Sequence, residues 1–315
     1  MPSGLTTLGD RAFAYCYNQA DGELPETVTS ISSYALAYCH GIVNASIPEG
    51  ITSLPGVFEG CENLERVSLP STLTSLGELS FYMCKSLKEI HIPDSVTSIG
   101  ANCFYQCENL PNIPLPAGLI TLGDYAFAYC PNQTDGNLPE TVTSIGAHVF
   151  AGCESMKTAS IPQGIEKISD YLFYKCAALE SVSIPDSITV LGQYCFANCA
   201  QLKEATIPAG VTEMGAYCFY KCGNLEGLYV PDGVTKIGSH AFAYCDKLTD
   251  VVIPEGVTRI ENATFYECET LNNVQLHDGI THIGDQAFYD CRQLNQFALP
   301  ANLETVVKIL IFLIV

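Results

Sequence analysis

The residues best suited to chemistry in this sequence are sixteen cysteines, whose thiols could form disulfides, bind a metal ion or act as nucleophiles. Thirteen of them recur at intervals of 23 residues, with a single interval of 22. These are Cys16, Cys39, Cys61, Cys84, Cys107, Cys130, Cys153, Cys176, Cys199, Cys222, Cys245, Cys268 and Cys291. If units of this length stacked, neighbouring cysteines would lie about 4.8 Å apart, which is within reach of a disulfide.

A structural role for these cysteines is favoured by their neighbours in the sequence. A phenylalanine precedes each of the thirteen by three residues, except where Leu36 takes its place. An evenly spaced row offers no tetrahedral cluster for a metal, and a free cysteine packs well as a small apolar group. The other three cysteines, Cys103, Cys195 and Cys218, replace an alanine of the same motif. We therefore predict buried thiols, with no metal and no cofactor.

Acidic side chains form a second regular set, since eight of them directly follow the position of the repeated proline, which His277 fills in one repeat. They are Glu26, Glu49, Asp94, Glu140, Asp186, Asp232, Glu255 and Asp278. Stacked carboxylates could collect calcium, but no Asp-x-Asp spacing supports a calcium loop, and solvated turn residues are the simpler interpretation. The sequence also lacks a phosphate-binding glycine loop, a His-Glu-x-x-His motif and a nucleophile elbow. We predict that the protein is not an enzyme.

Tyrosine offers the most interesting row for recognition. Fifteen of the seventeen tyrosines stand five, two or one residues before a repeat cysteine. The candidate partner-binding residues among them are Tyr125, Tyr129, Tyr171, Tyr174, Tyr217, Tyr220, Tyr266 and Tyr289. Exposed tyrosines are frequent hot spots of protein interfaces, but they also shield the outer side of a coil and form hydrogen bonds between coils. Both interpretations stay open.

Charge restricts the range of partners. The formal net charge is −20, from 34 acidic and 14 basic residues, and it would repel nucleic acid and anionic lipid surfaces. Residues 1–10 contain no basic stretch followed by an apolar run, so no secretory signal is expected there. Residues 306–315 form an apolar tail that is shorter than the roughly 20 residues of a membrane helix. It could be part of a truncated membrane anchor or an apolar cap.

The elements that position these side chains follow from one repeat, residues 225–245. Leu225, Leu228 and Val230 predict a short strand that ends at a proline, and residues 234–237 predict a second extended segment. The sequence Ala-Phe-x-x-Cys at 241–245 suits a single helical turn. About thirteen such coils predict one leucine-rich-repeat solenoid over residues 1–305, with parallel stacked strands and short helical turns. Because the interval of 22 falls at residues 54–58, we expect a local distortion there.

The motifs Ile-Pro-Asp-Ser-Val-Thr-Ser-Ile-Gly at 92–100 and Ala-Phe-Ala-Tyr-Cys at 241–245 resemble the repeats of BspA-type leucine-rich-repeat proteins. The resemblance extends over residues 2–303. It implies a non-enzymatic, protein-binding solenoid at the cell surface or secreted, which acts in adhesion to host proteins or other cells. The alternative is an intracellular structural or scaffolding solenoid, in keeping with many unoxidised thiols and no signal sequence.

Overall fold

The computed structural model describes residues 1–20, 22–295 and 298–306. The chain divides into two compact units, Met1–Met156 and Lys157–Val315, and each consists of stacked coils that carry short parallel strands. The leucine-rich-repeat solenoid of about thirteen coils is thereby confirmed. One continuous solenoid over 1–305 stays a prediction. Of the predicted apolar tail at 306–315, only Val306 belongs to the described residues.

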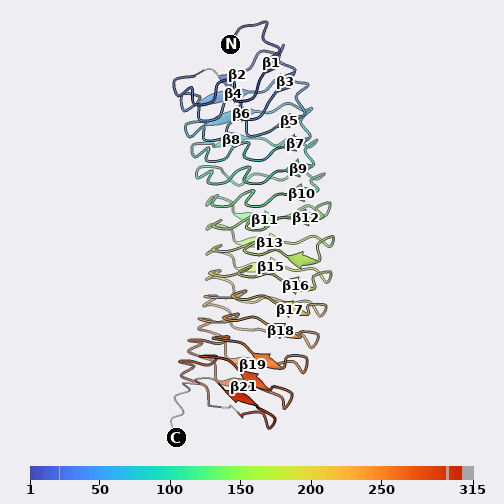
Figure 1. Cartoon of the computed structure of the whole chain (residues 1–315), viewed down its shortest axis with the longest axis vertical. Helices are drawn as coiled ribbons and strands as arrows, with labels where there is room; N and C mark the ends of the chain where they lie inside the picture. Colours follow the sequence, from blue (N-terminus) through green and yellow to red (C-terminus); the bar gives the residue numbers. More distant parts are fainter. Residues whose placement is uncertain (21, 296–297, 307–315) are drawn as a thin grey trace. The chain divides into compact units, whose positions relative to one another are not determined.

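Most coils of the first unit contribute two strands, one to each of two rows (Figure 1). The first-strand row comprises β2 (Gly22–Glu23), β4 (Asn44–Ser46), β6 (Arg66–Ser68), β8 (Glu89–Ile90) and β11 (Asp135–Asn137). The second-strand row comprises β1 (Thr7–Leu8), β3 (Ser30–Ile31), β5 (Ser53–Leu54), β7 (Ser75–Leu76), β9 (Ser98–Ile99), β10 (Thr121–Leu122) and β12 (Ser144–Ile145). Pairing within both rows is parallel and mostly offset by one repeat, so equivalent residues form columns.

The second unit repeats this arrangement. Its first-strand row comprises β13 (Thr158–Ser160), β15 (Ser181–Ser183), β19 (Asp250–Val252) and β21 (Asn273–Gln275). Its second-strand row comprises β14 (Lys167–Ile168), β16 (Val190–Leu191), β17 (Glu213–Met214), β18 (Lys236–Ile237), β20 (Arg259–Ile260), β22 (His282–Ile283) and β23 (Thr305–Val306). The first-strand row is interrupted between β15 and β19, where two coils carry a second strand but no first strand.

The second strands end at a glycine because the coils approach one another closely there. Gly238 N–H donates to the carbonyl oxygen of Met214 in the preceding coil, at 2.8 Å. A Cβ placed on Gly238 would lie 2.4 Å from the backbone nitrogen of Ala216, which no side chain could tolerate. The close approach of the coils favours glycine at this position, which follows most of the second strands.

The helical turns predicted for the Ala-Phe-x-x-Cys segments are wrong, since the described residues contain no helix. These segments are successive tight turns, and Tyr217 and Lys221 show how they close, with positive φ values of 60° and 59°. Tyr217, Phe219 and Lys221 donate their N–H groups to the next coil, to Ser239, Ala241 and Ala243. A helix would direct those N–H groups along its own axis, and the bonds between coils would be lost.

The predicted cysteine column is buried as expected. Every cysteine except Cys16 is buried, and all sixteen are free thiols. The Cys222 Sγ donates to the carbonyl oxygen of Phe196 at 3.1 Å, and most of the column repeats this contact with the phenylalanine 26 residues earlier. Phe196 and Phe219 stack beside this column with ring centroids 5.3 Å apart. The two columns form the centre of the core.

The predicted distortion at residues 54–58 is also present. The ladder of second strands breaks between β3 and β5, because β3 pairs only with β1 while β5 begins a new five-stranded sheet. In most other coils the residue after the second strand donates its N–H to the preceding coil, as Gly77 does to Leu54 at 3.1 Å. Pro55 holds that place after β5 and has no N–H to donate to Ile31.

Candidate functional site

The predicted tyrosine row of the second unit is a stacked column. Tyr171, Tyr194, Tyr217 and His240 come from four successive coils, and neighbouring ring centroids lie 4.6, 4.4 and 4.4 Å apart. Each ring is half-buried. Burial, reinforced by the neighbouring Tyr217, raises the pKa of Tyr194 to about 12. Tyr194 and Tyr217 therefore have a stacked ring on each face.

A second column runs beside the first. Tyr174 and Tyr220 pack edge-on against Tyr171 and Tyr217, at 5.5 and 5.4 Å. Further along, Tyr266 and Tyr289 stack at 4.9 Å. The structure therefore brings six of the predicted tyrosines of this unit into two adjoining columns.

Cations and carboxylates complete the aromatic surface of the second unit. Lys221 Nζ lies 5.3 Å from the ring centroid of Tyr220 and 5.2 Å from that of Tyr244. Burial and a hydrogen bond with Glu267 together raise the pKa of the Tyr266 phenol to about 12. The rings of Tyr220 and Tyr244 therefore already have a cationic neighbour, Lys221, from the same chain.

In the first unit the two predicted tyrosines lie around Tyr105. Tyr125 and Tyr129 make edge contacts with its ring at 6.2 and 5.5 Å, and Tyr125 also stacks on His148 at 4.2 Å. Tyr129 is the most exposed of the eight predicted residues, at 37%. Partner binding by these eight tyrosines stays a prediction, because the contacts between them already explain their spacing.

The tyrosine that stands apart is Tyr229, which lies outside the repeat positions that the sequence pattern singles out. It is 65% exposed, more than any other large apolar side chain in the described part of the chain. Among the tyrosines of residues 1–20, 22–295 and 298–306, only Tyr229 has neither an aromatic nor a cationic neighbour at its ring. Its ring is therefore not part of the stacked columns.

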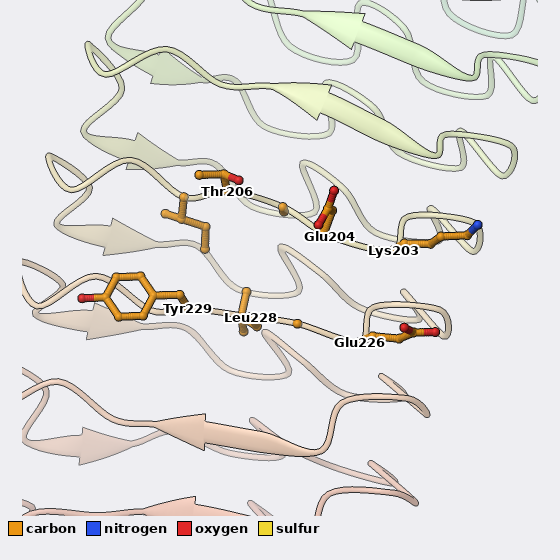
Figure 2. Close-up of a pocket in the computed structure, with 9 residues that line it drawn as sticks. Lys203, Glu204, Thr206, Glu226, Leu228 and Tyr229 are labelled. Atoms are coloured by element: carbon orange, nitrogen blue, oxygen red, sulfur yellow. The ribbon is translucent and has the colours of Figure 1, made fainter.

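Tyr229 lies at the edge of a groove of about 740 Å³, which we call the Tyr229 groove. The groove is lined by Lys203, Glu204, Ala205, Thr206, Ile207, Glu226, Gly227, Leu228 and Tyr229. Figure 2 shows that these residues come from two adjacent coils, with Lys203, Glu204 and Thr206 on one and Glu226, Leu228 and Tyr229 on the next. It occupies the interruption of the first-strand row between β15 and β19.

The interruption corrects the strand predicted at residues 225–230. In the first-strand row, pairing between the two coils is reduced to a single bridge from Glu204 to Gly227. A glycine inside a strand weakens it, because the backbone is less restricted and there is no side chain to pack. Gly227 also leaves the centre of the groove open, since a Cβ placed there would have no heavy atom within 4 Å.

The chemistry of the groove suits contact with a protein surface. Its lining combines apolar area from Leu228 and Tyr229 with exposed charges at Lys203, Glu204 and Glu226. It has hydroxyls at Thr206 and Tyr229 but no imidazole or thiol beside them to act as a base or a nucleophile. Aromatic side chains with a charged rim are typical of the centres of protein interfaces.

The described residues contain neither a metal-binding cluster nor a membrane-spanning helix. Across the described residues, no three or more His, Cys, Asp or Glu side chains are arranged to hold a metal ion. In the same part of the chain, no helix has the length and apolar character needed to cross a bilayer. The predicted acidic row therefore has no metal-binding cluster in residues 1–20, 22–295 and 298–306.

Sequence reasoning missed Tyr229 and Gly227 because both depart from the repeat. Only these departures could have signalled the groove: a tyrosine outside the regular columns, and a glycine within a predicted strand. The predicted tyrosines follow the repeat and consequently meet their own copies in the next coil. A residue that breaks the period is the one left without such a neighbour.

Known proteins show the same architecture. A leucine-rich repeat protein from Bacteroides ovatus is 29% identical, with a TM-score of 0.70, and the match covers 95% of this chain and 71% of that one. A leucine rich cell surface protein from Faecalibacterium prausnitzii is 26% identical, with a TM-score of 0.52 over 82% of this chain and 88% of that one. A leucine-rich repeat protein from Eubacterium ventriosum shares the fold at 22% identity, with a TM-score of 0.54 over 84% and 80% of the two chains. A search of the curated proteins found no match.

The repeat itself matches a family model along nearly the whole chain. The family is described as the BspA type leucine rich repeat region, and the matched residues are 1–111, 55–166, 120–249 and 235–309. These ranges include both units and the Tyr229 groove. The chain belongs to the BspA-type leucine-rich-repeat family.

Proposed function

We propose that this protein is a non-enzymatic binding solenoid of the cell-surface or secreted type, which attaches to host or partner proteins. The observation that carries the proposal is Tyr229, a 65% exposed aromatic side chain at the edge of a groove. Tyrosine is enriched at interface hot spots because it buries a large rigid area at a low cost in conformational entropy. Support for the surface setting comes from the Faecalibacterium prausnitzii relative, which is described as a cell surface protein.

The repeated architecture suits such a role. Stacked coils hold columns of side chains in fixed register, so a partner meets a surface that is ordered before binding. The outward positions of the first-strand row vary from coil to coil, for instance Ser183, Thr206, Tyr229 and Val252 at intervals of 23. This variation gives each stretch of the face its own chemistry while the core stays constant.

Biolayer interferometry of the full chain against a panel of purified extracellular-matrix proteins tests the proposal. We expect at least one protein of the panel to bind, and Tyr229→Ala to weaken that binding by roughly tenfold or more, which is the loss typical of a hot spot. Ser68→Ala is the matched control, because Ser68 holds the same repeat position in the first unit and is also exposed. Equal binding by wild type and Tyr229→Ala would contradict the assignment of the site.

A further inference from the structure

Arg66 in the first unit and Gly227 in the second hold the same place in the repeat, five residues after the repeat cysteine. Arg66 pairs in register with Asn44 of the preceding coil and with Glu89 of the following coil. Its Nη1 donates to Asn44 Oδ1 at 3.1 Å, and its Nε lies 3.0 Å from Glu89 Oε1. One guanidinium therefore bridges the side chains of both neighbouring coils.

The corresponding place in the second unit has the carboxylates but lacks the guanidinium. Gly227 pairs with Glu204 of the preceding coil, and the 23-residue period puts Asp250 in the same place of the following coil. Both carboxylates are exposed. Asp250 accepts a hydrogen bond from Asn273 at 3.3 Å, and the side-chain carboxylate of Glu204 has no ion-pair or hydrogen-bond partner among the described residues. The position between them is open, since a Cβ on Gly227 would meet no heavy atom within 4 Å.

Apolar area lies beside this open position on the same face. Tyr229 follows Gly227 by two residues, which is the period that returns an extended chain to the same side. One repeat further on, Val252 takes the corresponding place and is 55% exposed, next to the 65% exposed Tyr229. An incoming extended segment would thus meet two carboxylates at one residue and two apolar side chains two residues along.

We infer that the Tyr229 groove binds an extended segment of a partner protein that carries an arginine, with its guanidinium between Glu204 and Asp250 where Arg66 stands in the first unit. An apolar residue two positions along that segment contacts Tyr229 and Val252. This inference deepens the proposed function and rests on it. The net charge of −20 favours a basic segment, and carboxylates exclude a phosphorylated or acidic one.

Arginine fits this position better than lysine. A planar guanidinium offers five N–H donors in a fixed arrangement and can serve two carboxylates at once, as Arg66 serves two side chains. It can also lie against an exposed aromatic ring such as that of Tyr229. A lysine ammonium is a compact, strongly hydrated charge and gains less from either contact.

The test uses the full chain and the peptide acetyl-Gly-Arg-Ser-Leu-Gly-amide, with binding followed by broadening of the peptide resonances in an NMR titration. We expect a Kd of about 1 mM or tighter, because the peptide makes few contacts. Replacing its arginine by the uncharged isostere citrulline should weaken binding about tenfold, since a charge-assisted hydrogen bond is lost. Raising the salt concentration should weaken it as well, because the charges are exposed.

Variants of the chain locate the binding. Gly227→Arg supplies the guanidinium internally and should weaken peptide binding about tenfold or more, since one occupant excludes the other. Arginine is sterically acceptable there, because Gly227 has no positive φ and its Cβ position is open. Thr158→Arg is the matched control: it adds the same charge at the same repeat position of β13 and should leave binding unchanged. Glu204→Gln, which alters no backbone contact, should weaken binding roughly threefold to tenfold.

Three results would overturn the inference: no binding of the arginine peptide to the wild-type chain, equal binding of the citrulline peptide, or full binding by Gly227→Arg. Each is distinguishable from failure of the proposed function. If Tyr229→Ala still weakens binding of an intact matrix protein while the arginine peptide does not bind, the arginine position is wrong and the binding surface stands. Circular dichroism of every variant confirms that its fold is retained.

Discussion

Tyr194 and Tyr217 stack face to face across adjacent coils, with ring centroids 4.4 Å apart and an interplanar angle of 6°. Tyr217 meets His240 in the same way on its other face, at 4.4 Å. Tyr217→Ala removes both stacked pairs, each worth about 0.5–1.5 kcal/mol. We expect the free energy of unfolding to fall by about 1–3 kcal/mol, measured by urea denaturation followed by circular dichroism.

The control for this prediction is Tyr229→Ala, because Tyr229 has no ring neighbour in the described chain. Its free energy of unfolding should stay within about 0.5 kcal/mol of wild type, as is usual for an exposed surface position. If Tyr217→Ala proves equally neutral, the column does not stabilise the coils and its tyrosines are available to a partner.

Thiol labelling measures the burial of the cysteine column. Cys16 is exposed and the other fifteen cysteines are buried, so a thiol reagent should modify about one group per native chain at a fast rate. After denaturation all sixteen should react. A Cys16→Ser chain is the matched control and should show no fast reaction. Rapid modification of several thiols in that variant would contradict the buried column.

Stability should fall as the pH rises above about 9. Burial raises the pKa of Cys39 to about 11 and that of Cys222 to about 12, whereas an unfolded cysteine titrates near 8.5–9. The contribution of these protonated thiols is complete below the unfolded pKa. It is lost as the pH rises towards the folded values, because the unfolded chain releases protons first. Urea midpoints at pH 8, 9 and 10, with a reductant present, should decrease in that order.

Cys222→Ala isolates one thiol within that trend. The variant should be less stable than wild type at pH 8, because it loses packing volume. Its decline in stability above pH 9 should be shallower by up to about 1.4 kcal/mol per pH unit, which corresponds to one proton. Parallel pH profiles for the two chains would show that Cys222 ionises equally in both states.

Backbone strain in the turns gives a stabilising prediction. Gln286 is exposed and has a φ of 55°, in the left-handed region that costs a residue with a Cβ about 1–2 kcal/mol. Gln286→Gly should raise the free energy of unfolding by about 0.5–1 kcal/mol, even though glycine is less restricted in the unfolded chain. The comparison is Gln201→Gly, which is exposed without a positive φ and should be neutral or destabilising. A loss of stability in Gln286→Gly would contradict the strain.

The period of the sequence was sufficient to predict the coil, the parallel columns and the buried thiols. The prediction succeeds because stacking places equivalent residues of successive coils side by side. Phe219 therefore lies against another phenylalanine, and Cys222 lies beside another cysteine. The turn conformation could not be predicted from apolar spacing alone. Ala-Phe-x-x-Cys fits one turn of helix and also fits the tight turns that direct N–H groups into the next coil.

The groove was beyond prediction for a different reason. A search for regular rows selects residues that repeat, and Tyr217 repeats while Tyr229 does not. The consequence of Gly227 is likewise structural, since the loss of pairing and the open space between Glu204 and Asp250 depend on three coils together. Periodicity predicts the scaffold, and the departures from it mark the candidate site.

Hydrogen–deuterium exchange of the full chain, alone and with the matrix protein that binds it most tightly, tests the central claim most directly. The claim is that the Tyr229 groove on the first-strand face receives the partner. Amide exchange should slow in peptides that contain residues 203–207 and 226–229, and Tyr229→Ala should abolish that protection. Protection confined to the tyrosine columns at residues 217–220, with no change in the groove, would contradict the claim.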